Sequence, residues 1–221
     1  MKDSANDTPR AIAELIAQLG RITQGEASAE NPAPLTPAHP MSAPLTPAQW
    51  TVLRFFARAN RFSRTVSAFA EYHATTRGTA SQTIKSLVAT GYLVRTRSVE
   101  DGRSARLDLT DTARACLGSD PLLALSRAAG DLSPQSRRGL AASLRQMLGD
   151  IAREKCRRPF GLCSACDHLL KGETCCAGEE QSYTCNLRNE VLDKAELGLI
   201  CFDFVAGKGP SAPLPLSGLS S

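Results

Sequence analysis

The stretch 79–110, TASQTIKSLVATGYLVRTRSVEDGRSARLDLT, changes its hydrophobic period once, and that change decides the fold. Apolar residues recur at helical spacing over 79–90, and Gly91 is the residue type that usually follows a helix C-terminus. From 92–97 the pattern alternates as a strand does. An Asp-Gly pair marks a tight turn, and 105–109 alternates again. The stretch therefore predicts a helix followed by a two-stranded hairpin.

Two more helices are expected upstream of this stretch. Thr46 is a good N-cap and Pro47 suits the first helical position, so a helix should run from there to about residue 60. A third helix is expected over 65–73, and Thr110 should cap another short one. Three helices followed by a hairpin form a winged helix-turn-helix, predicted over 45–117. The predicted fold class is mainly α with a small β-hairpin wing and flanking dimerisation helices.

The flanking segments differ in composition from this middle part. Residues 10–24 place apolar side chains at helical spacing, and 26–44 is rich in Ala, Pro and Ser. A helix is expected over 133–155, and its leucine stripe fits an intramolecular core and a subunit interface equally well. The predicted parts are an N-terminal dimerisation helix (1–25), a Pro-rich linker (26–44), the winged helix (45–117), C-terminal dimerisation helices (118–155), a cysteine-rich tail (156–206) and a disordered terminus (207–221).

Charge is distributed unevenly around a net value of +4. Residues 46–117 hold eleven Lys/Arg against five Asp/Glu, whereas 159–221 hold four against eight. A basic middle part fits double-stranded DNA as a partner, although ordinary surface charge explains a surplus of this size almost as well. The N-terminus lacks the apolar region of a signal peptide, and no apolar run is long enough to span a membrane. A cytoplasmic protein with no membrane partner is expected.

The runs LTPAQWTVLRFF (45–56), TASQTIKSLVATGYLVRTRS (79–98) and EDGRSARLDLT (100–110) together resemble the MarR family of bacterial regulators. The wing sequence Asp101-Gly102-Arg103-Ser104 is their most specific piece. The resemblance implies a homodimer built from the outer helices. It also implies a sequence-specific transcription regulator, more often a repressor, with a small-molecule effector as a further candidate partner. The chain departs from the family pattern at 26–44 and beyond Cys156.

The predicted DNA contacts follow from how a winged helix docks, with one helix in the major groove and the hairpin tip at the minor groove. Gln pairs with adenine and Lys with guanine acceptors. The candidate base-reading residues are Thr79, Ser81, Gln82 and Lys85. The candidate phosphate contacts are Thr76, Arg77 and Thr83. On the wing, Arg103 is expected in the minor groove, oriented by Asp101 and supported by Arg95, Arg97 and Arg106. For Ser81 and Thr83, simple solvent exposure is an equal alternative.

Seven of the eight cysteines lie between residues 156 and 201. Cys163 and Cys166 form a C-x-x-C, which with Cys185 and Cys201 makes a candidate four-thiolate metal site. The tail has one such knuckle and scattered single cysteines, which favours an iron–sulfur cluster slightly over Zn²⁺. His168 could replace one ligand, and a metal-free thiol switch at Cys175 or Cys176 is a third alternative. Cys116 and Cys156 are expected on helices as small buried side chains.

The sequence thus predicts a homodimeric DNA-binding regulator with a metal- or redox-responsive tail. Two alternatives stay open at this point: a structural zinc tail with ligand sensing elsewhere, and a winged-helix adaptor that binds another protein. An enzyme is not expected, because the chain has only three histidines and its tail is short and acidic.

Overall fold

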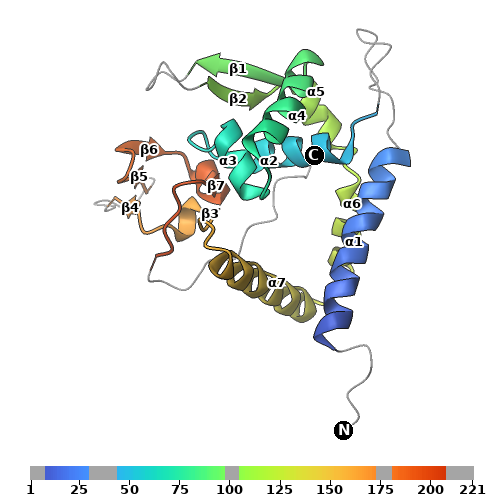
Figure 1. Ribbon diagram of the computed structural model, residues 1–221. Helices are drawn as coiled ribbons and strands as arrows, with labels where there is room; N and C mark the ends of the chain where they lie inside the picture. The colour runs from blue at the N-terminus through green and yellow to red at the C-terminus, as the bar shows by residue number, and fades with distance from the viewer. Residues whose placement is uncertain (1–7, 30–43, 98–104, 173–180, 208–221) are drawn as a thin grey trace.

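The computed structural model describes residues 8–29, 44–97, 105–172 and 181–207. These residues form three parts: a winged helix, an arm of three outer helices, and a tail of short strands (Figure 1). In chain order the helices are α1 (Pro9–Ala29), α2 (Pro47–Arg58), α3 (Val66–Tyr72), α4 (Arg77–Ala89), α5 (Asp111–Leu117), α6 (Leu122–Gly130) and α7 (Pro134–Glu154). The wing strands, between α4 and α5, are β1 (Leu93–Arg97) and β2 (Ala105–Leu109).

A threonine N-cap opens each of the four helices of the winged helix. The hydroxyls of Thr46, Thr65, Thr76 and Thr110 each accept a hydrogen bond from the backbone N–H three residues on. The predicted helices and hairpin are confirmed, with one correction at the start of α4. Thr76 accepts from the Thr79 N–H at 3.1 Å, so the helix begins at residue 77, not at 79.

The core of the winged helix lies between α2, α3, α4 and the hairpin. Phe55 packs edge-on against Phe56 and Phe69, with ring centroids 5.3 and 5.5 Å apart. The hairpin pairs antiparallel with Leu93 opposite Leu109, and both side chains are buried. At the end of α4, Gly91 has φ +77°, a conformation that favours glycine, and closes the helix as predicted.

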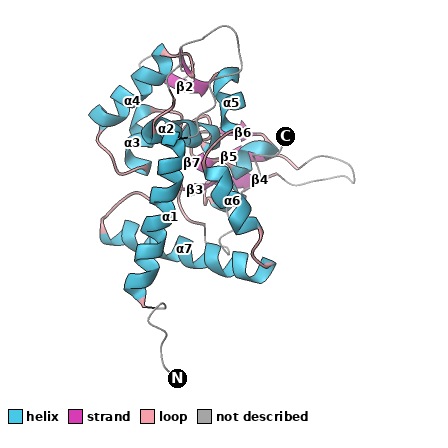
Figure 2. Cartoon of the chain, turned by 90° about the vertical axis from the view of Figure 1, so that its right-hand side faces the viewer, coloured by secondary structure: helices cyan, strands magenta, loops and turns pink. Residues whose placement is uncertain are grey.

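The arm consists of α1, α6 and α7, which extend away from the winged helix (Figure 2). None of their described side chains is buried. Helix α1 contacts α2 and α6, and it continues to Ala29, into the segment predicted as a linker. Helix α6 was not anticipated as a separate element. Of the described helices, none is long and apolar enough to cross a membrane.

The tail folds into two small antiparallel sheets, which the sequence did not predict. Strand β3 (Gly161–Leu162) pairs with β7 (Ile200–Cys201), and β5 (Tyr183–Cys185) pairs with both β4 (Leu169–Lys171) and β6 (Glu190–Leu192). Two 3-10 turns, η1 (Cys163–Ala165) and η2 (Lys194–Gly198), connect them. The tail docks on the winged helix, where Ile200 is buried and its carbonyl accepts from the Asn60 N–H at 2.9 Å. The terminus predicted as disordered lies outside the described residues, apart from Gly207.

Candidate nucleic-acid interface and cysteine pocket

Helix α4 presents one polar face to solvent. Ala80, Ile84 and Leu87 fix its orientation, because they recur at helical spacing and are buried in the core. On the opposite side, Gln82 and Lys85 are exposed. Exposed Thr79 extends this face toward the helix N-terminus. Three of the four predicted base-reading side chains therefore lie on one accessible surface.

The remaining polar side chains of α4 are placed less favourably for base contacts. Ser81 and Thr83 are half-buried, and the Thr83 hydroxyl donates to the Thr79 carbonyl at 3.2 Å. Thr76 is exposed and its hydroxyl lies 2.9 Å from that of Thr79, with which it shares a hydrogen bond. Arg77 is exposed in the first turn, where helix N–H groups also attract phosphates.

The wing arginines divide between two faces of the hairpin. Arg95 is exposed and stands opposite Leu107, whereas half-buried Arg106 stands opposite Thr96. Because directly opposed residues share a face and neighbours alternate, Arg95 and Arg106 point to opposite sides. The side chain of Arg97, and all of Asp101 and Arg103, lie outside the described residues.

The loop between α2 and α3 holds the base of the wing. Arg64 donates to the Asp108 carboxylate at 2.7 Å and to the Ala59 carbonyl at 3.1 Å. The Arg64 carbonyl accepts from the Leu107 N–H at 2.9 Å, and Thr96 donates to Asp108 at 2.9 Å. Through these contacts the loop is attached to β2, and Asp108 connects it to Thr96 on β1.

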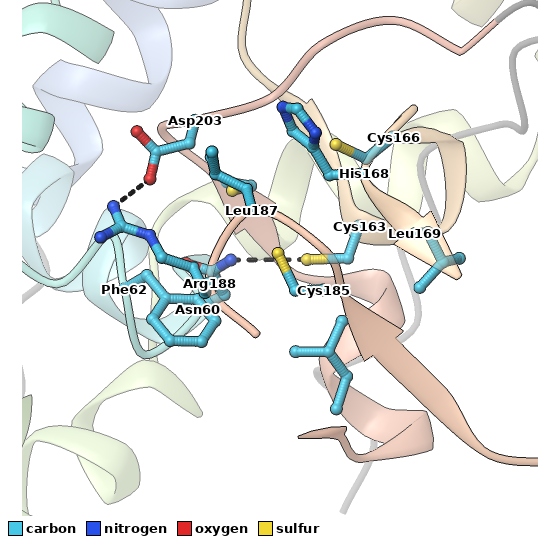
Figure 3. A pocket seen from close by; sticks show the side chains of 12 residues that line it. Asn60, Phe62, Cys163, Cys166, His168, Leu169, Cys185, Leu187, Arg188 and Asp203 are labelled. Carbon is cyan, nitrogen blue, oxygen red and sulfur yellow. Dashed lines mark hydrogen bonds and ion pairs between the residues drawn. The ribbon is translucent and has the colours of Figure 1, made fainter. Parts of the chain in front are cut away.

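All four cysteines predicted as metal ligands line one pocket (Figure 3). Cys163 lies in turn η1 and Cys166 follows it, while Cys201 lies in β7 next to β3 and Cys185 ends β5. The hollow between these side chains measures about 350 Å³ when the open solvent at its mouth is included. His168, Leu169, Leu187, Arg188, Leu192 and Asp203 also line it, together with Asn60 and Phe62 from the α2–α3 loop.

Asn60 connects this pocket to the winged helix. Its side chain is fully buried, and its amide nitrogen donates to Cys163 Sγ at 3.4 Å. Its amide oxygen accepts from the Ser63 N–H at 3.0 Å, which fixes the side chain in place. Hydrogen bonds from the Cys163 thiol and from Asn60 lower the pKa of Cys201 below its usual value, against the opposing effect of burial. The same thiol–thiolate bond, together with burial, raises the pKa of Cys163.

The shared pocket does not form a compact cage for one ion. Among the described residues, no three His, Cys, Asp or Glu side chains are grouped so that they could hold a metal ion. Cys175 and Cys176 lie outside the described residues. The expectation for Cys156 was wrong: it follows the end of α7, is exposed, and has φ +48°. Cys116 is half-buried against the core of the winged helix, and burial raises its pKa.

Four further pocket residues were not indicated by the sequence: Asn60, Phe62, Arg188 and Asp203. Arg188 forms an ion pair with Asp203, and its guanidinium lies 5.6 Å from the centre of the Phe62 ring. Asn60 is more than 100 positions from Cys163, and no local pattern in the sequence links the two. Only the docking of the tail brings these residues together.

A second hollow of about 630 Å³, including open solvent, lies where α2, α3 and Ile200 meet. Arg54, Arg58 and His73 line it together with Thr51, Phe55 and Tyr72. Burial, with a smaller effect of Arg54, lowers the pKa of His73 from 6.5 to about 4. The imidazole is therefore neutral around pH 7, and its buried Nε2 forms no hydrogen bond with any residue that the structure describes.

Residues 43–104 match the model of the MarR family. A solved structure of S. aureus MepR with DNA aligns with a TM-score of 0.50 at 14% identity, covering 67% of this chain and 99% of that one. A MarR/EmrR family regulator from Acinetobacter sp. ADP1 aligns at 0.49, with 15% identity over 65% of this chain and 96% of that one. A MarR transcriptional regulator from Methanosarcina mazei Go1 aligns with a TM-score of 0.48 at 20% identity, covering 65% of this chain and 98% of that one.

No curated protein matches the sequence. The likeness to MepR shows a shared fold, and the predicted winged-helix fold class is confirmed. Nearly all of the MepR chain aligns with two thirds of this chain, so a third of this chain lies outside the alignment.

Proposed function

We propose that this protein is a homodimeric transcription regulator that binds double-stranded DNA in a sequence-specific way and acts as a repressor. One observation carries the proposal: α4 exposes Thr79, Gln82 and Lys85 on one face, while its other face is locked into the core. Two comparisons support the same function: residues 43–104 match the MarR family, and the MepR structure is a complex with DNA.

The dimensions and chemistry of α4 suit the major groove. Thirteen residues give a helix of about 20 Å, and a major groove admits one α-helix. Gln82 would donate to and accept from an adenine edge, and Lys85 would donate to guanine acceptors. Arg77, in the first turn, would contact a phosphate. Arg95 and Arg106 would add positive charge at the wing.

A homodimer explains the arm. Exposed large apolar side chains recur along two of its helices, and a surface of this kind marks an interface. They are Ile12, Leu15, Ile16, Leu19 and Ile22 on α1, and Leu140, Met147, Leu148 and Ile151 on α7. A two-fold dimer would bury this surface and present two recognition helices to successive half-sites of a palindromic operator.

The test is selection of genomic fragments on the full-length protein, followed by gel shifts at low salt. We expect retardation of a few palindromic fragments, weaker binding by Gln82→Ala, and lower transcription in vitro from a promoter that contains the site. Complete absence of retardation would refute DNA binding and favour a protein-binding adaptor. Retardation together with raised transcription would refute the repressor role but not DNA binding. The expectation of a small-molecule effector stays a prediction.

A further inference from the structure

We propose that the pocket lined by Cys163, Cys166, Cys185 and Cys201 binds an iron–sulfur cluster, which ties the tail to the winged helix through Asn60. The cluster goes beyond the proposed DNA binding, because its presence does not depend on that function. Its effect on DNA affinity does rest on the proposed function.

The core of the tail is small. The buried cluster of the tail contains Cys163, Cys201 and Leu192, so two of its three residues are cysteines. Its strands are two or three residues long. Domains this small usually need a disulfide or a metal to remain folded, and these cysteines are free thiols. A metal–sulfur group in the pocket would supply the missing stabilisation.

The placement of the four cysteines favours a cluster over a single ion. A structural zinc ion needs four ligands about 2 Å from one point, and no three described side chains are grouped in that way. An iron–sulfur cluster distributes its cysteines over more than one iron, so its ligands need not converge on one point. The four cysteines come from three separate segments and all line this pocket; Figure 3 shows Cys163, Cys166 and Cys185 around it.

The surroundings of the four sulfurs also suit a cluster. Four thiolates carry negative charge, and the guanidinium of Arg188 lies at the same pocket. Asn60, fully buried, directs its amide N–H at Cys163 Sγ, and hydrogen bonds to the ligating sulfurs tune clusters. Phe62, Leu187 and Leu192 complete an apolar lining that limits access of water.

The same pocket is attached to the loop that holds the wing. Arg61 donates to Glu196 at 3.2 Å and to the Val191 carbonyl at 2.6 Å, and Ser63 Oγ accepts from the Phe202 N–H at 2.7 Å. The next residue along the loop, Arg64, holds the hairpin through Asp108. A cluster bound in the pocket would fix the loop residues that contact the tail, and would thereby favour one position of the wing.

The first experiment uses the full-length chain purified without oxygen, or reconstituted with ferrous iron and sulfide. We expect a brown protein with visible absorption and comparable amounts of iron and acid-labile sulfide. Cys163→Ser and Cys185→Ser should both lose the colour. Cys156→Ser, which changes an exposed cysteine outside the pocket, should retain it. Circular dichroism shows whether each variant is folded, and the half-buried Cys185 is the less disruptive site.

Three outcomes overturn the cluster. They are a colourless protein with one equivalent of zinc, a protein that takes up neither iron nor zinc, and a Cys156→Ser variant that loses colour as fully as Cys163→Ser. The link to the winged helix is tested by gel shifts of loaded and chelator-treated protein. We expect a change in DNA affinity of at least about fivefold. If the loaded and the chelator-treated protein bind DNA with equal affinity, the link to the winged helix is refuted, but the cluster is not.

Discussion

Replacement of Leu19 by Glu should break the dimer that we propose. Nine large apolar side chains on α1 and α7 remain 37–68% exposed. Full burial of such a side chain is worth about 1.5–3 kcal/mol, so covering the exposed half contributes roughly 1 kcal/mol each. In a two-fold interface each side chain counts twice, which gives roughly 18 kcal/mol against an association cost of about 4–15 kcal/mol. A stable dimer is therefore expected of the wild-type chain.

Leu19→Glu changes this balance at two symmetric positions. Each copy loses roughly 1 kcal/mol of apolar burial and would bury a carboxylate at a further cost of at least about 1 kcal/mol. A total of about 4 kcal/mol weakens dimerisation about a thousandfold. Leu170→Glu on β4 is the matched control, since Leu170 is 50% exposed and Leu19 46%, and the control lies outside the arm.

Sedimentation equilibrium over nanomolar to micromolar protein concentrations measures the dissociation constant of each variant. The expected order is a tight wild-type dimer, an equally tight Leu170→Glu dimer, and a Leu19→Glu monomer with unchanged circular dichroism. A wild-type chain that is monomeric at micromolar concentration would refute the reasoning. So would a Leu19→Glu dimer within tenfold of the wild-type affinity.

Three further predictions concern single side chains. Gln82→Ala should reduce discrimination at one base pair by about 1–3 kcal/mol in competition gel shifts. Arg77→Ala should weaken binding to all DNA sequences alike and reduce the slope of log affinity against log salt concentration by about one. Asp120→Ala should cost about 3 kcal/mol in urea unfolding, because it leaves Arg54 without the buried carboxylate that accepts from its Nε at 2.7 Å; unchanged stability would contradict this. For His73, the folded pKa of about 4 lies below the unfolded value of 6.5, so the unfolded chain binds the proton first and stability falls as pH drops from about 6.5 to 4. Partial exposure reduces the loss to roughly 2 kcal/mol, and urea titrations of His73→Gln should lack this component.

The winged helix could be predicted from sequence because its signals are local. Thr46, Thr65 and Thr110 each cap a helix through a hydroxyl three residues away, and Gly91 ends α4 through its own backbone conformation. Such contacts depend on residues within one turn. The start of α4 was misplaced because the Thr-Thr-Arg-Gly run at 75–78 reads as a break, although Thr76 also satisfies the cap.

The tail could not be predicted in the same way. Its strands are too short to show an alternating period, and Cys163 meets Cys201 only after β3 pairs with β7. The cysteine spacing pointed to four residues that all line one pocket, while their role as metal ligands stays a prediction. It could not indicate Asn60, which reaches the pocket from a different domain. The exposure of side chains along α4 could not be predicted from local sequence either. It depends on how the core covers the helix, which leaves Ser81 and Thr83 half-buried.

The tail is fixed to the molecule at two places, and this arrangement would let a change in the tail alter the geometry of the proposed dimer. Helix α7 leads into the tail, and the segment between them is held on α3: Arg158 pairs with Glu71 at 3.7 Å, and the Phe160 and Tyr72 rings meet at 5.0 Å. The second attachment is the α2–α3 loop at Asn60. A change in the tail therefore acts on both ends of α3, the helix that braces α4. Because α7 belongs to the arm, the same change would alter the angle between arm and winged helix, and in a dimer that angle sets the separation of the two recognition helices.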